Sequence, residues 1–109
     1  MIKTGDNSIK TLLEGKVKLN KEDVIGKPLH LLDIVIGHSE DNGDYGYFIL
    51  EGNEYISIPS SSFDVFAGYA ADAADIAAIR KGNYDVIFNS ATSKKGRQYY
   101  TCYLEIHKI

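Results

Sequence analysis

The sequence predicts a single, mainly β domain that carries one helix. Its 109 residues are the length of one domain, and 44% hydrophobic with 25% charged residues is typical of a chain with a packed core. Short runs rich in β-branched and aromatic residues alternate with turn signals, and only residues 60–82 form a long alanine-rich stretch. The single cysteine, Cys102, excludes an internal disulfide, so the stability of the fold must come from packing.

Three strands are predicted in the first half of the chain. Residues 29–36 are rich in Leu, Ile and Val and too short for a stable isolated helix, which favours a buried strand. The pair Asn42-Gly43 tolerates the positive φ angles of a type I′ turn, so a hairpin should return the chain along residues 45–52. A third strand at residues 54–58 completes an antiparallel meander.

One helix and two further strands are predicted in the second half. Serines precede the alanine-rich stretch as candidate N-caps, and Arg80, Lys81 and Gly82 form a typical C-terminal end. Beyond it, residues 84–90 and 98–109 indicate two strands joined by a polar loop.

The predicted element order corresponds to a known architecture. Three strands, a helix between strands three and four, and two more strands make up the five-stranded Greek-key barrel called the OB fold. We therefore expect an OB-fold domain at residues 28–109, preceded by a basic N-terminal arm at residues 1–27.

Residues 24–109 also resemble a known family. The order IGKPLHLLDIVIG, DYGYFILEG, EYISIPS, a helix and SKKGRQYYTCYLEI is similar to small OB-fold single-stranded-DNA-binding proteins of phages and conjugative plasmids of Gram-positive bacteria. The basic loop that runs into consecutive tyrosines is the most specific part of this likeness. The resemblance implies that the chain binds single-stranded DNA. Since no secretory signal or catalytic constellation is found in the sequence, we expect it to act in the cytoplasm and not as an enzyme. The chain differs from bacterial housekeeping single-strand binders because it has no Trp and no acidic C-terminal tail.

Tyrosines on the second and third predicted strands are the first candidate binding residues. Strand alternation places Tyr45 and Tyr47 opposite Phe48, and it places Tyr55 on the outward face of the next strand. Bases of single-stranded nucleic acid stack on outward aromatic side chains at this position of an OB barrel. The alternative explanation is that Tyr is simply a residue that favours strands.

The loop between the last two predicted strands is the second candidate. It carries Lys94, Lys95 and Arg97 and is followed by Tyr99. Cations that contact phosphates beside an aromatic ring are what sequence-tolerant single-strand binding requires. The alternative is a hairpin tip that only increases solubility.

The charge distribution supports a different hypothesis. Residues 28–79 hold nine acidic residues and no Lys or Arg, whereas the basic residues lie toward the two ends. Because strands two and three of an OB domain usually supply cations to a nucleic-acid groove, this pattern favours an alternative function. The chain would then be a protein-binding module of a phage or plasmid that uses its Ala-rich helix and acidic middle surface.

Other classes of function find less support in the sequence. The acidic loop at residues 40–44 lacks the spacing of a calcium loop, the three histidines lack ligand spacing, and no nucleophile motif occurs. We therefore expect no metal, no cofactor and no catalytic residues. No stretch is long and apolar enough for a membrane helix. Single-stranded RNA stays open as a ligand, and the arm is a candidate contact to a second copy of the chain.

Overall fold

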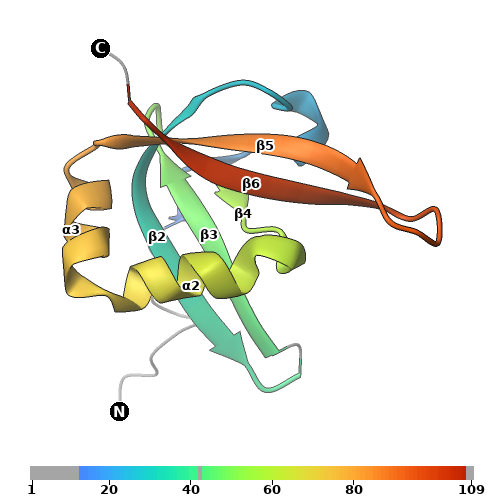
Figure 1. Cartoon of the computed structure of the whole chain (residues 1–109). Helices are drawn as coiled ribbons and strands as arrows, with labels where there is room; N and C mark the ends of the chain where they lie inside the picture. Colours follow the sequence, from blue (N-terminus) through green and yellow to red (C-terminus); the bar gives the residue numbers. More distant parts are fainter. Residues whose placement is uncertain (1–12, 42, 108–109) are drawn as a thin grey trace.

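The computed structural model describes residues 13–41 and 43–107. These residues form one curled sheet with two helices at its open end (Figure 1). The elements in chain order are β1 (Val17–Lys18), the 3-10 turn η1 (Lys21–Asp23), β2 (Leu29–Ser39), β3 (Gly43–Leu50), β4 (Glu54–Ser57), the 3-10 turn η2 (Ser60–Ser62), α2 (Phe63–Ala71), α3 (Ala73–Arg80), β5 (Tyr84–Thr92) and β6 (Gln98–Ile106).

The sheet is a half-barrel with the strand order β1-β4-β3-β2-β5-β6. Strand β2 belongs to both halves, because Leu31 pairs with Leu50 of β3 and with Tyr84 of β5. A register shift between Leu31 and Asp33 lies where the strand changes partner. Such an irregularity increases local twist, which allows one long strand to serve both halves of a curled sheet.

The structure corrects the predicted element count. It has six strands rather than five, because Val17–Lys18 of the predicted arm pairs in parallel with β4. It has two helices rather than one, because Asp72 is extended and its side chain accepts a hydrogen bond from the Asp75 amide at 2.9 Å. Asp favours N-caps over helix interiors, so it ends α2 and begins α3. The predicted arm joins the sheet, and its first 12 residues lie outside the described part of the chain.

The core lies between the concave face of the sheet and the helices. Phe48 of β3 contacts Phe66 of α2 and Phe88 of β5, with ring centroids 4.8 and 5.9 Å apart in edge-to-face geometry. All three rings are almost completely buried. Val24 of the predicted arm also belongs to this core. Within the described residues, no helix is long and apolar enough to cross a membrane.

Serine side chains connect the two sides of the half-barrel. Strands β4 and β6 are not neighbours in the sheet, and η2 lies between them. The Ser61 hydroxyl donates to the Tyr100 carbonyl at 2.5 Å, and the Cys102 amide donates to Ser62 Oγ at 3.3 Å. Burial raises the pKa of the Cys102 thiol to about 11, which keeps it protonated and unreactive at neutral pH.

Candidate nucleic-acid interface

Three tyrosines lie together on the convex face of β3 and β4. The rings of Tyr45 and Tyr47 are 6.0 Å apart, and those of Tyr47 and Tyr55 are 5.5 Å apart, both in edge-to-face geometry. All three side chains are partly exposed, whereas Phe48 and Ile56 on the other face are fully buried. The alternation expected from the sequence is confirmed, and we call these three residues the tyrosine array.

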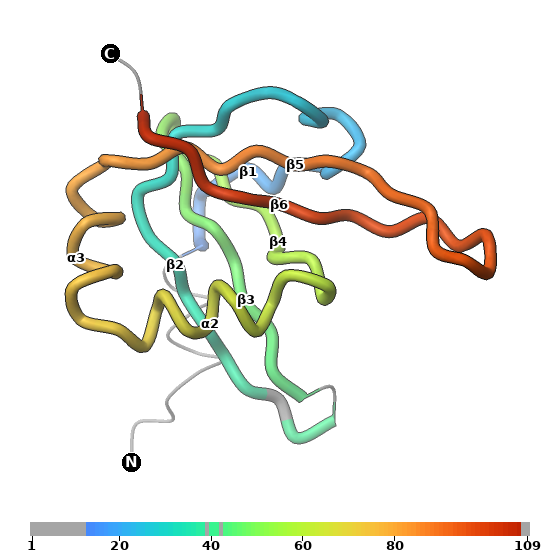
Figure 2. Tube along the Cα trace, viewed as in Figure 1, coloured from blue at the N-terminus to red at the C-terminus, as the bar shows by residue number. Residues whose placement is uncertain are grey.

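Lysines from the N-terminal part of the chain border the tyrosine array. Figure 2 shows β1 running beside β4, and Lys18 is the register partner of Tyr55, so their side chains share a face. Lys21 Nζ donates to Ser57 Oγ at 2.5 Å, and Ser57 is in turn opposite Tyr47. Burial lowers the pKa of Lys21, and the positive charge of Lys18 lowers it further. Strands β3 and β4 carry no Lys or Arg, so the positive charge beside them comes from Lys18 and Lys21, which precede β2.

The second candidate group occupies a separate hairpin. Lys94, Lys95 and Arg97 are exposed in the loop between β5 and β6, and Tyr99 at the start of β6 is 40% exposed. Hydrogen bonds between Ser93 and Arg97 close this loop. The β2–β3 and β5–β6 hairpins project from the body in different directions (Figure 1). The structure therefore brings Lys18 and Lys21 to the tyrosine array, and it places the basic loop on another projection.

Acidic side chains lie at the opposite end of the tyrosine array. A pocket of about 380 Å³ extends from Tyr45 and Tyr47 to the start of α2. Asp44 and Asp64 are among the residues that line it. Asp44 lies on the same face of β3 as Gly46 and Phe48, and Asp64 lies on α2, so both acidic residues border the Tyr45 end of the array from its edge. The array thus has lysines near Tyr55 and acidic residues near Tyr45, so a bound polyanion would be attracted to one end only.

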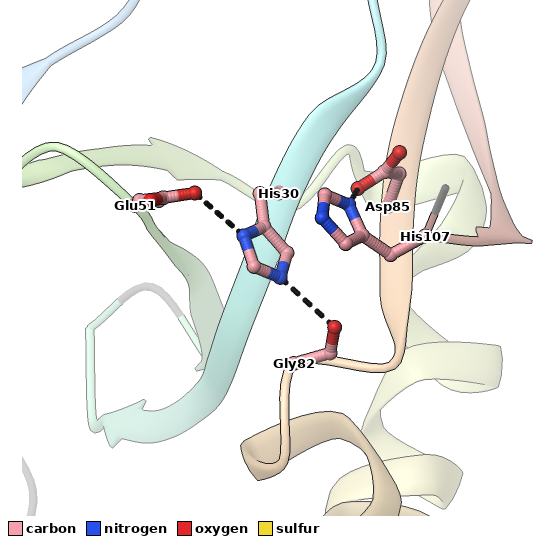
Figure 3. Close-up of polar contacts among 5 residues, drawn as sticks. All are labelled: His30, Glu51, Gly82, Asp85 and His107. Atoms are coloured by element: carbon pink, nitrogen blue, oxygen red, sulfur yellow. Dashed lines mark hydrogen bonds and ion pairs between the residues drawn. The ribbon is translucent and has the colours of Figure 1, made fainter. Parts of the chain in front are cut away.

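A histidine pair forms a second polar cluster, away from the predicted site residues. The rings of His30 and His107 are stacked with centroids 3.7 Å apart (Figure 3). His30 bonds to Glu51 and to the Gly82 carbonyl, and His107 bonds to Asp85. In the described part of the chain, no group of three or more His, Cys, Asp or Glu side chains is arranged to hold a metal ion.

Comparisons with protein-family models, curated proteins and solved structures find no match for this chain. The functional argument therefore depends on the geometry of the residues themselves.

The sequence did not identify Lys18 and Lys21 as part of the candidate site. A strand of two residues has no periodic pattern, so nothing in the local sequence indicates that Lys18 lies beside Tyr55. The only signal was the excess of lysine in residues 1–27. Chemically, the arrangement offers flat aromatic surfaces for unpaired bases and ammonium groups for the adjoining phosphates.

Proposed function

We propose that the chain is a non-enzymatic OB-fold protein that binds single-stranded DNA with little sequence preference. The supporting observation is the tyrosine array on the convex face, with Lys18 directly beside Tyr55. Every base has a π face, so stacking on tyrosine is tolerant of sequence, and lysine contacts to phosphates add affinity. The DNA strand would run along β3 and β4 with its backbone toward β1.

The strand order supports the OB assignment. Strands β2 to β6 take the places of the five OB strands, because β2 pairs with both β3 and β5, and the helices follow β4. In an OB domain, the face of the second and third strands binds oligonucleotides. These strands correspond to β3 and β4, which carry the tyrosine array. The extra strand β1 lies on the edge of β4.

The loop between β5 and β6 would provide a second contact. Lys94, Lys95 and Arg97 are exposed cations, and Tyr99 offers another ring for stacking. We expect this hairpin to hold a part of the strand beyond the tyrosine array.

The alternative function is protein binding through α2. One observation favours it: Val65 is 56% exposed on this helix, next to the acidic Asp64. A partner with an apolar and basic surface would suit this face.

Titration of three fluorescent ligands tests the proposal. Oligo(dT) and oligo(U) of about 30 bases and a DNA duplex of the same length are compared by anisotropy at equal salt. Stacking requires unpaired bases, so we expect oligo(dT) to bind more tightly than the duplex. The ratio of the affinity for oligo(U) to the affinity for oligo(dT) measures any preference for RNA. Equal affinity for single strand and duplex contradicts the stacking mechanism, and no binding at low salt leaves the protein-binding alternative.

A further inference from the structure

The pocket at the acidic end of the tyrosine array arises from unequal strand lengths. Strand β4 ends at Ser57 opposite Tyr47, whereas β3 extends back to Gly43, so part of the edge of β3 is not covered by β4. After Pro59 the chain turns through η2 into α2, which places the first turn of α2 across from this edge. The residues that line the pocket are Asp44, Tyr45, Gly46, Tyr47, Ser57, Ile58, Ser60, Phe63 and Asp64.

Gly46 keeps the strand close to its neighbours at the floor of this pocket. A Cβ atom at this position would lie 2.7 Å from Ile36 Cδ1 and 2.8 Å from Ile58 Cδ1, which is shorter than van der Waals contact. Both isoleucines therefore close over the backbone of Gly46, and of the two only Ile58 lines the pocket.

The lining combines aromatic with acidic residues. Tyr45, Tyr47 and Phe63 are its aromatic residues, and Asp44 and Asp64 are its acidic ones. One oxygen of Asp44 is 2.6 Å from Nδ1 of His38. Two carboxylates repel a phosphate, so the chemistry of this pocket selects a flat, uncharged group that donates hydrogen bonds.

Nucleobases differ in their ability to satisfy this pocket. Cytosine, adenine and guanine carry an exocyclic amino group, and a carboxylate accepts a hydrogen bond from such a group. Thymine has no amino group, and its one donor on this edge, N3–H, lies between two carbonyl oxygens that would face the carboxylates unfavourably. Since the pocket is continuous with the tyrosine array, a strand stacked there could place one base in it.

We propose that this pocket is a base-recognition subsite that accepts an amino-bearing base and disfavours thymine. The inference rests on the proposed single-strand binding and adds to it a preference at one position of an otherwise tolerant interface. The carboxylate of Asp64 is the main acceptor, because Asp44 is already engaged by His38.

Homopolymer binding to matched variants tests this subsite. Oligo(dC) and oligo(dT) of equal length are titrated by anisotropy at pH 8, where oligo(dC) stays single-stranded, with wild type, Asp64→Ala and Asp64→Asn. The control is Asp75→Ala, which removes the same charge from an exposed position on α3. Circular dichroism checks that each variant is folded.

We expect the wild type to bind oligo(dC) at least about fivefold more tightly than oligo(dT), as for one base-specific contact. Asp64→Ala should bring this ratio close to one, and Asp64→Asn should reduce it. Asp75→Ala should change both affinities equally and leave the ratio as it is. If wild type and both Asp64 variants bind with the same ratio of oligo(dC) to oligo(dT) affinity, the subsite is overturned but the proposed function stands. A failure of both homopolymers to bind overturns the two together.

Discussion

The ring of His30 lies flat against the ring of His107, with centroids 3.7 Å apart and an angle of 7° between the planes. Nδ1 of His30 is 2.6 Å from Glu51 Oε2, and Nε2 is 2.9 Å from the Gly82 carbonyl oxygen. Both partners are acceptors, so the protonated ring, in which both nitrogens donate, satisfies both of them. His30 lies on β2, and its ring bonds to the turn after β3 and to the turn after α3 (Figure 3). Its stacking on His107 also ties it to the residue that follows β6.

Stability should therefore depend on the charge of His30. The hydrogen bond to Glu51, and then the one to Gly82, raise the pKa of His30 above its ordinary 6.5. The contribution of this charge is complete below pH 6.5 and is lost as the pH rises through the raised pKa. We expect His30→Gln to lower the free energy of unfolding by roughly 1.5 to 3 kcal/mol in acid, and by less as the pH increases. Urea unfolding between pH 5.5 and 9 measures this difference.

The matched control for His30 is the same substitution at His38. His38 also pairs with a carboxylate, Asp44, but its side chain is 69% exposed at a hairpin. We expect His38→Gln to change the free energy of unfolding by less than about 0.5 kcal/mol. If the free energies of unfolding of wild type and His30→Gln differ by the same amount at every pH in this range, the assignment of a charged His30 is contradicted.

Removing a ring from the tyrosine array should weaken binding to single-stranded DNA. We expect Tyr47→Ala or Tyr55→Ala to cost roughly 1 to 3 kcal/mol of binding free energy, and Tyr47→Phe to cost much less because its ring still stacks. Tyr103→Ala is the control, since Tyr103 is 45% exposed but lies on β6. If the double variant Tyr47→Ala/Tyr55→Ala binds like wild type and remains folded by circular dichroism, the bases stack elsewhere.

The salt dependence of binding should separate two groups of cations. Five phosphate contacts at about 0.7 each predict a slope of log affinity against log salt of roughly −3.5. Replacing the three loop cations by Ala should leave a slope of about −1.4, and replacing Lys18 and Lys21 beside the tyrosine array should leave a slope of about −2. An unchanged slope in both variants would show that neither group contacts the phosphates. The five residues are Lys18, Lys21, Lys94, Lys95 and Arg97.

The serine connection across the half-barrel should control the opening of β6. Ser62 is buried and its Oγ accepts from the Cys102 amide, so Ser62→Ala leaves this donor without a partner. We expect a loss of about 1 to 3 kcal/mol in unfolding free energy and faster hydrogen exchange at the Cys102 amide. The exposed Ser60 provides the control variant Ser60→Ala. Identical exchange in the two variants would contradict a role of Ser62 in holding β6.

Much of the fold could be predicted because its signals are local. The Asn42-Gly43 turn and the alternation around Phe48 indicate the β2–β3 hairpin and the outward direction of Tyr47. The break between the helices was missed, although Asp72 is a typical N-cap residue, because the alanine-rich composition on both sides favours one continuous helix.

The sequence by itself determined the mainly β character of this protein, the position of its turns and the face on which Tyr45, Tyr47 and Tyr55 lie. Only the tertiary structure decided that Lys18 lies beside Tyr55, that His30 stacks on His107, and that a pocket opens between β3 and α2. The physical reason is the range of the interactions. Strand alternation and turn geometry act between residues close in sequence, whereas parallel pairing, ring stacking and a pocket between elements depend on how distant segments meet.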